Sequence, residues 1–173
     1  MPSDKIVRKI AVIFVTDAVG FSKMMAKNED QTLKSLRLCR EILDNLFEEH
    51  GGRIFNTAGD SVLAEFQSAV SAVICATEFQ KLIKERNASV EADAQMRFRV
   101  GLNMGDVIVE GSNLYGDGVN VASRLEALCQ PEGVSLSKSI HDFVSQKVDF
   151  TFADLGDQKV KNTVVHAFDI TME

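Results

Sequence analysis

The sequence predicts an α+β sandwich, with a mainly antiparallel sheet and helices packed against it. Short apolar or alternating runs, typical of strands, are interspersed with longer amphipathic stretches, typical of helices. Several strand-like runs are separated only by short turn sequences, which indicates hairpins and antiparallel pairing. The 173 residues are 45% hydrophobic and 25% charged, a globular composition. We therefore expect one domain over 1–173, and leave open whether further domains follow Glu173 in a longer protein.

The chain begins with a buried strand and a long helix. Residues 10–15 form a continuous apolar run, which is typical of a central strand buried on both faces. Residues 29–50 carry an apolar stripe at helical spacing, with charged side chains on the opposite face. Gly51 and Gly52 follow, and glycine often provides the left-handed backbone at a helix end. The pair therefore predicts where the helix stops.

A hairpin and a second helix come next. Residues 53–55 and 61–66 have the character of short strands, joined by a turn at 56–60. Residues 68–86 are amphipathic and predict a helix. The polar stretch 87–95 predicts a loop before the second half of the chain.

The second half contains mostly short elements. Apolar residues alternate over 96–102, which predicts a strand with one buried face. We expect the chain to turn at 103–106 into a strand at 107–109, as a second hairpin. The remaining predictions are a helix at 116–129, a strand at 134–136, a short helix capped by Ser137, and closing strands at 150–155 and 164–170.

Charge, cysteines and hydropathy exclude several classes of function. The net charge is −6, so a basic surface for nucleic acid, and hence a nucleic-acid partner, is not expected. Cys39, Cys75 and Cys129 are odd in number and far apart, which favours buried free thiols over disulfides or zinc ligands. There is no signal-peptide pattern, and no apolar run approaches the ~20 residues of a membrane helix. We expect a cytoplasmic protein without membrane insertion.

Two aspartates are the main candidates for metal binding. Asp17 ends the first apolar run, and Asp60 follows Gly59 in the predicted hairpin turn. Carboxylates at the ends of neighbouring strands can hold hard divalent cations, and paired metals are a common device for in-line phosphoryl chemistry. Taken singly, Asp17 could cap the following helix, and Asp60 could stabilise its own turn.

The segment after Asp17 predicts a phosphate-binding turn. Val19, Gly20, Phe21 and Ser22 form a tight connection from the strand to a helix. Backbone N–H groups at a helix start bind phosphate oxygens well. A metal held by Asp17 could bridge the same oxygens.

Asn120, Arg124 and Lys161 are candidates for contact with a nucleotide. Asn120 and Arg124 are four residues apart in the helix at 116–129 and so share one face. Asparagine can orient a ribose, and arginine can stabilise charge on a transferring phosphoryl group. Lys161, just before the last strand, could reach a triphosphate. The alternative for all three is an ordinary solvated surface.

Taken in order, these segments resemble the catalytic domain of class III nucleotidyl cyclases, the adenylate and guanylate cyclases. The likeness covers roughly residues 8 to 171, and four motifs in the same order make it specific. Two of the motifs are metal motifs, Phe14-Val-Thr-Asp17-Ala-Val-Gly20-Phe21-Ser22 and Thr57-Ala-Gly59-Asp60-Ser-Val-Leu-Ala-Glu-Phe66. The third is the transition-state motif Tyr115-Gly-Asp-Gly-Val-Asn120-Val-Ala-Ser-Arg124-Leu-Glu126, and the fourth is Val160-Lys161-Asn162.

The resemblance implies a ferredoxin-like βαββαβ sandwich and a two-metal mechanism. Asp17 and Asp60 would bind two Mg²⁺ or Mn²⁺ ions, and the ribose 3′-hydroxyl would attack the α-phosphate to give a 3′,5′-cyclic nucleotide and pyrophosphate. The backbone of Val19 to Ser22 and the side chain of Lys161 would hold the β- and γ-phosphates. Asn120 would position the ribose, and Arg124 would stabilise charge on the α-phosphate.

The resemblance also implies that the site is shared between two chains. In this family one subunit supplies the aspartates, and the other supplies the residues that correspond to Asn120 and Arg124. Because this chain has all of them, a head-to-tail homodimer with two symmetric sites follows.

The sequence departs from the family pattern at the two positions that read the base. Asn56, four residues before Asp60, stands where adenylate cyclases of this type usually have lysine. Asn113, seven residues before Asn120, stands where they have Asp, Thr or Ser. Guanylate cyclases typically have Glu and a small residue at these positions. Asparagine can both donate and accept, so it can pair with adenine or with guanine.

We therefore expect ATP as the substrate and keep GTP as the alternative. A second alternative is a catalytically weak domain that binds a nucleotide or a partner and regulates another activity. A diguanylate cyclase or polymerase palm shares the two-metal logic, but the chain lacks the Gly-Gly-Asp/Glu-Glu-Phe hairpin.

Overall fold

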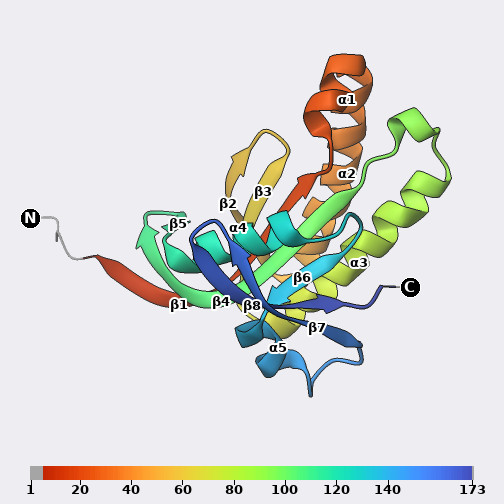
Figure 1. Cartoon of the computed structure of the whole chain (residues 1–173). Coiled ribbons are helices and arrows are strands. Elements are labelled where there is room, and N and C mark those ends of the chain that lie inside the picture. Colours follow the sequence, from red (N-terminus) through yellow and green to blue (C-terminus); the bar gives the residue numbers. More distant parts are fainter. Residues whose placement is uncertain (1–5, 173) are drawn as a thin grey trace, which may run out of the picture.

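An eight-stranded sheet forms the centre of the computed structural model, which describes residues 6–172 (Figure 1). The strand order is β2-β3-β1-β4-β6-β8-β7, and β5 pairs with β4. All pairs are antiparallel except β4 with β6. The strands are β1 Val7–Ala18, β2 Gly52–Ala58, β3 Ser61–Phe66, β4 Phe98–Glu110, β5 Asn113–Tyr115, β6 Val134–Ser137, β7 Phe152–Val160 and β8 Thr163–Ile170. The predicted α+β fold with a mainly antiparallel sheet is confirmed.

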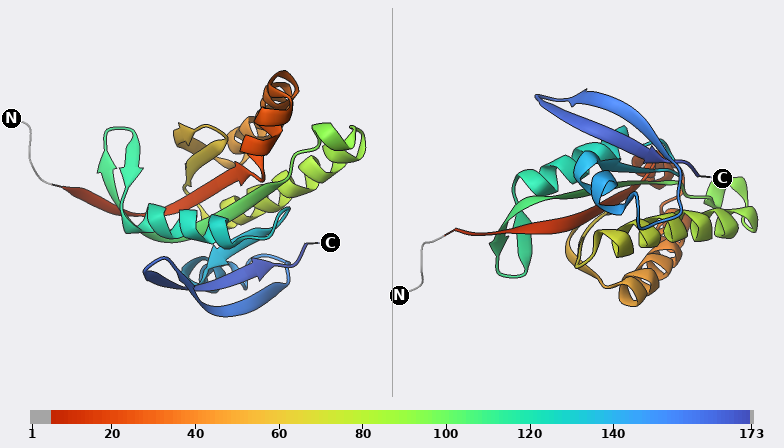
Figure 2. Two further views of the ribbon diagram at one scale, coloured as in Figure 1. Left: turned by 45° about the horizontal axis from the view of Figure 1, so that its top comes forward. Right: turned by 90° about the horizontal axis from the view of Figure 1, so that it is seen from below.

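Helices cover both faces of this sheet (Figure 2). The helices are α1 Phe21–Lys27, α2 Glu29–His50, α3 Ala69–Ala88, α4 Asp117–Leu128 and α5 Lys138–Val144, with a 3₁₀ turn, η1, at Ala92–Ala94. On one face α2 and α3 pack on β1, β3 and β4, around Phe14, Phe47 and Phe79. On the other face α4 packs through Val119 and Ala122 onto Ile13 of β1. The aspartates at the strand ends are thus held by a sheet that is packed on both sides.

The predicted long helix is confirmed in both its bounds. Asn28 caps the start of α2, where its side chain accepts a hydrogen bond from the N–H of Gln31. Gly51 ends it in the left-handed conformation, with φ of 83°, and donates its N–H to the carbonyl of Phe47. The predicted cap at Ser137 is also present, because its hydroxyl accepts from the N–H of Ile140 at the start of α5.

The predicted turn at 103–106 is wrong, because β4 continues through it to Glu110. This strand pairs with β1 along twelve positions, from Val7 opposite Val109 to Ala18 opposite Phe98. Gly105 lies inside this strand and not in a turn, and a Cβ there would lie 3.1 Å from Nδ2 of Asn103 and 3.5 Å from the Cα of Gly118 in α4. The actual turn comes at Gly111, which has φ of 60° and leads into β5.

The first hairpin is longer than predicted. The stretch 56–58, expected in the turn, belongs to β2, so only Gly59 and Asp60 connect β2 to β3. Gly59 has φ of 59°, as a tight two-residue turn requires. At the opposite end of the sheet, the start of β1 and the β4–β5 turn project beyond the helices (Figure 1). Val7 and Ile10 are exposed on this projection.

Glu65 is a buried carboxylate that forms ion pairs with two cationic side chains. This β3 residue is 5% exposed, and its carboxylate lies 2.6 Å from Lys9 Nζ and 3.0 Å from Arg53 Nη2. Burial by itself raises the pKa of Glu65, but the hydrogen bonds from Lys9 and Arg53 outweigh burial and lower the pKa. The ionised carboxylate therefore stabilises the fold above the pKa of the unfolded chain, and this contribution is lost as the pH falls through the lowered folded-state pKa.

We expect Glu65→Gln to lower the free energy of unfolding at pH 7 by about 2 kcal/mol, because two cations lose their charged acceptor. The difference from wild type should shrink below about pH 4, where the glutamate is protonated in the unfolded chain. Urea unfolding at pH 7 and pH 3.5 measures both values. Glu48→Gln, at an exposed position of α2, is the matched control. An equal loss at the two pH values would contradict the proposed role of the charge.

Candidate active site

The fold brings Asp17 and Asp60 together at one end of the sheet. Asp17 is near the end of β1, and Asp60 lies in the turn between β2 and β3. Because β3 pairs with β1, the Asp60 turn lies against the end of β1. The Oδ2 atom of Asp60 accepts a hydrogen bond of 2.7 Å from the N–H of Ala18, the residue after Asp17. Two carboxylates from neighbouring strands therefore face the same small region.

Arg99 also enters this region, and the sequence reasoning missed it. It stands directly opposite Asp17 in the pairing of β1 with β4. Its guanidinium donates to both carboxylate oxygens of Asp17, at 3.2 and 3.4 Å. The signal for this contact was the β1–β4 pairing, which the wrongly predicted turn at 103–106 concealed.

Glu126 of α4 is a third carboxyl group beside Asp17, and it was also missed. It is 5% exposed, and its Oε1 atom has no hydrogen-bond partner within residues 6–172. Burial, the hydrogen bond and charge of Asp17, and the charge of Asp60 raise the pKa of Glu126 to about 9, against the opposing effect of Arg99. The group is thus protonated near neutral pH. The signal in the sequence was its helical spacing from Ala122, which places it on the apolar face of the helix.

Gly101 explains how α4 approaches the aspartates so closely. A Cβ at this position of β4 would lie 2.3 Å from the backbone nitrogen of Glu126 and 2.4 Å from the carbonyl oxygen of Ala122. Only glycine permits that approach of strand and helix. The glycine therefore sets the position of Glu126 and of the rest of α4 relative to β1.

The turn after Asp17 has the form of a strand-to-helix connection. Gly20 has φ of 68° and precedes α1, and no side chain caps the start of this helix. The first helical hydrogen bond runs from the N–H of Met24 to the carbonyl of Gly20. The N–H groups of Phe21 and Ser22 precede that bond and stand at the helix start. Val19 differs, because its N–H is donated to the carbonyl of Arg97 at 2.8 Å.

The other predicted residues make no direct polar contact with the aspartates within residues 6–172. Asn120 and Arg124 are both on α4, with Asn120 exposed and Arg124 half-buried. Lys161 is exposed at the tip of the β7–β8 hairpin, in the left-handed conformation with φ of 55°. The aspartates are thus not joined to these three residues by any hydrogen bond or ion pair within residues 6–172.

The two candidate base-reading positions are on neighbouring elements. Asn56 is exposed on β2, and Asn113 begins β5. The two elements contact each other, and Arg53 of β2 donates a hydrogen bond of 2.7 Å to the carbonyl of Ser112, next to Asn113. The start of β2 thus lies against the turn that precedes Asn113.

The family described as the adenylate and guanylate cyclase catalytic domain matches residues 3–171. The chain belongs to this family.

Individual relatives support the assignment of a cyclase domain. "Putative adenylate cyclase 3" of Rhizobium meliloti (strain 1021) is 44% identical over 164 residues, which are 94% of this chain and 28% of that protein. The chain thus spans little more than a quarter of that relative's length. The solved adenylate/guanylate cyclase/hydrolase from Silicibacter pomeroyi has a TM-score of 0.90 and 34% identity, and the match covers 98% of this chain and 100% of that chain. The adenylyl cyclase CyaB from P. aeruginosa, at 21% identity and a TM-score of 0.83 over 98% of this chain and 97% of its own, shares the fold.

The aspartates of this cyclase domain fit a divalent metal. Cyclases of this family generally use divalent metals, and magnesium is commonly held by one or two carboxylates together with phosphate oxygens of the substrate. Asp17 and Asp60 supply hard oxygen donors of that kind at the end of a rigid sheet. Within residues 6–172 no group of three or more His, Cys, Asp or Glu side chains is arranged as a complete metal cage. A metal held by the two aspartates would take its remaining ligands from water and phosphate oxygens.

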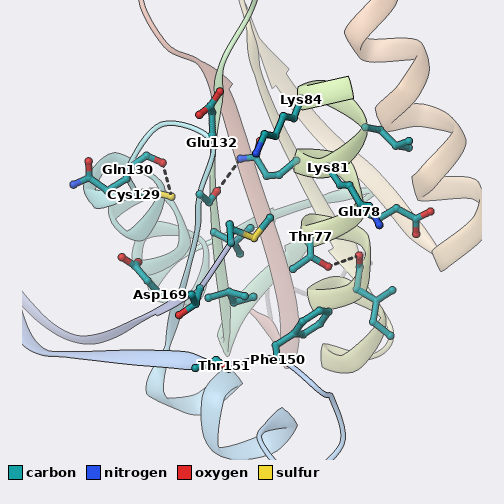
Figure 3. Close-up of a pocket in the computed structure, with 18 of the residues that line it drawn as sticks. Thr77, Glu78, Lys81, Lys84, Cys129, Gln130, Glu132, Phe150, Thr151 and Asp169 are labelled. Carbon is teal, nitrogen blue, oxygen red and sulfur yellow. Dashed lines mark hydrogen bonds between the residues drawn. The ribbon is translucent and has the colours of Figure 1, made fainter. Parts of the chain in front are cut away.

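A separate cleft of about 1120 Å³ lies away from the aspartates of the cyclase domain (Figure 3). It is bounded by α3, the loop at 129–134 and the end of β8. Its labelled side chains carry both signs of charge, with Lys81 and Lys84 on α3 and Glu132 and Asp169 elsewhere on the wall. No candidate site residue lines it.

None of the helices within residues 6–172 has the length and apolar character needed to cross a membrane.

Proposed function

We propose that this domain is a purine nucleotide cyclase that converts ATP to 3′,5′-cyclic AMP and pyrophosphate. The observation that carries this proposal is the juxtaposition of Asp17 and Asp60 at the sheet end, beside the turn at Gly20. That arrangement suits the binding of a metal–triphosphate complex. Membership of the cyclase family and the bacterial adenylate cyclase relatives support the choice of reaction.

In the proposed reaction the aspartates hold two divalent ions, Mg²⁺ or Mn²⁺. Bound there, the metals would make the ribose 3′-hydroxyl a better nucleophile and neutralise phosphate charge. Gly20, Phe21 and Ser22 bind the β- and γ-phosphates through the backbone at the start of α1. Val19 belongs to the same turn, but its N–H is donated to the carbonyl of Arg97 and so is not available to a phosphate.

The remaining groups orient the nucleotide and stabilise the charge that develops during attack. Asn120 positions the ribose, and Arg124 stabilises the negative charge on the α-phosphate as the 3′-oxygen bonds to phosphorus and pyrophosphate leaves. Lys161 neutralises the outer phosphates from the tip of its hairpin. These roles are assigned because the three residues stand at the positions of this chain that match the motifs of the family.

We propose further that each site is completed by a second copy of the chain. Asn120, Arg124 and Lys161 make no contact with Asp17 or Asp60 among the interactions of residues 6–172. Cyclase domains bind nucleoside triphosphates and dimerise. A head-to-tail homodimer would place the aspartates of one subunit opposite α4 of the other, with two equivalent sites.

The choice of base rests on Asn56 and Asn113. Each carboxamide has a donor and an acceptor, so the pair can match adenine or guanine. We place ATP first and GTP second. The alternative is a regulatory domain that binds a nucleotide without converting it. This alternative is specific to the present chain because both of the usual base-reading residues are replaced. Nucleotide binding without turnover would favour it.

Product analysis with purified protein tests the proposed function. We expect cyclic AMP and pyrophosphate from ATP with Mn²⁺, and a slower reaction or none with GTP. Asn56→Lys should widen the preference for ATP, because lysine is the residue usual at this position in adenylate cyclases. The proposal fails if neither triphosphate gives a cyclic product under conditions in which the protein is folded and dimeric.

A further inference from the structure

The segment that opens β4 contacts the candidate active site on both sides of Phe98. The carbonyl of Arg97, just before the strand, accepts the N–H of Val19 at 2.8 Å. Arg99, just after Phe98, donates to both carboxylate oxygens of Asp17. The position of these three consecutive residues therefore affects both the turn that follows β1 and the carboxylate that would bind metal.

The sheet itself gives Phe98 little support on the side of β6. The pairing of β4 with β6 begins only two residues later, at Val100 opposite Val134. The carbonyl of Phe98 therefore lies beyond the paired part of the two strands. Segments with few paired backbone groups open locally more easily than the centre of a sheet. A contact from outside the sheet would hold this segment in place.

Gln80 of α3 provides such a contact. Its side chain is 3% exposed, and its Nε2 atom donates to the carbonyl of Phe98 at 2.9 Å and to that of Gly133 at 2.8 Å. Gly133 directly precedes β6. The backbone N–H of Glu132 donates to the same carbonyl of Phe98 at 2.8 Å. One carboxamide thus joins α3 to the starts of β4 and β6.

The carboxamide of Gln80 is used only at its nitrogen. Both of its neighbours are carbonyl oxygens, which can only accept, so the atom that faces them must be the nitrogen, and both of its hydrogens are used. The Oε1 atom is buried and has no hydrogen-bond partner within residues 6–172. A buried acceptor without a partner costs free energy, so the net stabilisation from this side chain is reduced. The contact matters more for the place at which it holds β4.

We propose that Gln80 is a positioning residue of the active site, which fixes the start of β4 and with it Arg99 and the turn at Val19. The inference rests on the proposed cyclase function. Gln80 acts through the carbonyl of Phe98 and not by contact with a ligand. Without this tie, the groups that would receive a metal–triphosphate lose part of their fixed geometry, and the complex binds less tightly.

Gln80→Met tests the proposal, because it keeps the size of the side chain and removes the two donors together with the unpaired oxygen. The ring of Phe98 still packs against that of Phe79, with 5.2 Å between the ring centroids, so α3 stays docked on β4. We therefore expect a melting temperature within about 3 °C of wild type.

Amide hydrogen exchange followed by NMR measures the position of the β4 start directly. Exchange at the N–H of Val19 should become about tenfold faster in Gln80→Met, because the carbonyl of Arg97 that accepts it is less firmly held. The N–H of Phe14, in the centre of β1, should keep its rate. The Kd of 3′-deoxy-ATP with Mn²⁺, a pair that cannot cyclise, should weaken about fivefold in calorimetry.

Thr77→Val is the matched control. Thr77 lies three residues before Gln80 on α3, and its hydroxyl donates only to carbonyls of the same helix, those of Val73 and Ile74. The substitution therefore removes a buried polar group from α3 without touching β4. It should match wild type in the exchange rate of Val19 and in the Kd.

The role of Gln80 is overturned if Gln80→Met leaves the exchange of Val19 and the Kd at wild-type values. Equal acceleration at Val19 and Phe14 would overturn it as well, since a purely structural role predicts that result. Gln80→Asn, one carbon shorter and unable to span both carbonyls, replaces the methionine variant if that variant does not fold. Failure of both variants to fold would show a role in stability and overturn the proposal. If wild type yields no cyclic product, the proposed function fails, and hydrogen exchange still tests Gln80.

Discussion

Asp17→Asn is expected to reduce formation of the cyclic product by on the order of 10³-fold or more. The substitution keeps the size of the side chain but removes the charge that would hold a divalent metal, and such metals supply several kcal/mol of charge stabilisation in the transition state. The change also leaves Arg99 without its carboxylate partner. Initial rates with Mn²⁺ and Mn²⁺ binding followed by electron paramagnetic resonance should both fall. Asp44→Asn, at an exposed position of α2, is the control and should match wild type in both.

The same variant also tests the composite site by mixing. Arg124→Ala should be inactive on its own, because it removes the charge opposite the α-phosphate. In a dimer of one Asp17→Asn chain and one Arg124→Ala chain, one of the two sites regains both native residues. Random reassortment of equal amounts should therefore restore about a quarter of wild-type activity. A mixture that stays as inactive as its components would show that each chain builds its site alone.

The second large effect is expected for Gly101→Ala. The added methyl group would meet the backbone nitrogen of Glu126 and the backbone oxygen of Ala122 at under 2.5 Å, and backbone atoms cannot rotate away. Either α4 or β4 must shift, so we expect a loss of at least about 3 kcal/mol and a melting temperature lower by about 10 °C. Activity should fall as well, because α4 holds Asn120 and Arg124.

Gly105→Ala provides the comparison for this prediction. It adds the same methyl group to the same strand, but its nearest neighbour is the side-chain nitrogen of Asn103 at 3.1 Å. A side chain can adjust by a few tenths of an ångström, so the destabilisation should be clearly smaller. Scanning calorimetry of the two variants decides the matter. Equal melting temperatures of the two variants would contradict the prediction, because they would show that the close contact of α4 with β4 at Gly101 does not make the added methyl group more destabilising there.

Local patterns were sufficient to predict most elements and the metal motifs. The stripe over 29–50 and the glycines after it specify α2, because helix periodicity and a left-handed end are both encoded within a few residues. Asp17 could be placed at a strand end in the same way, from the apolar run that precedes it.

What the sequence did not reveal depends on contacts between distant segments. Gly105 looks like a turn residue in the sequence, but it lies inside the continuous strand β4. Once β4 is known to be continuous, Arg99 falls opposite Asp17, 82 residues away. Glu126 becomes a partner of Asp17 only through the packing of a helix on a strand. No local periodicity carries that information.

The ion pair between Arg99 and Asp17 bears on how the domain would respond to metal supply. A divalent ion that binds Asp17 would compete with the Arg99 guanidinium for the same carboxylate. Breaking the Arg99–Asp17 pair costs free energy, which lowers the affinity for free metal. An ion that arrives bound to the triphosphate also brings phosphate groups, with which the released arginine can pair. In the proposed reaction the rate of cyclic nucleotide formation would therefore depend on the concentration of the metal–nucleotide complex. It would depend less on the concentration of free metal or of free nucleotide.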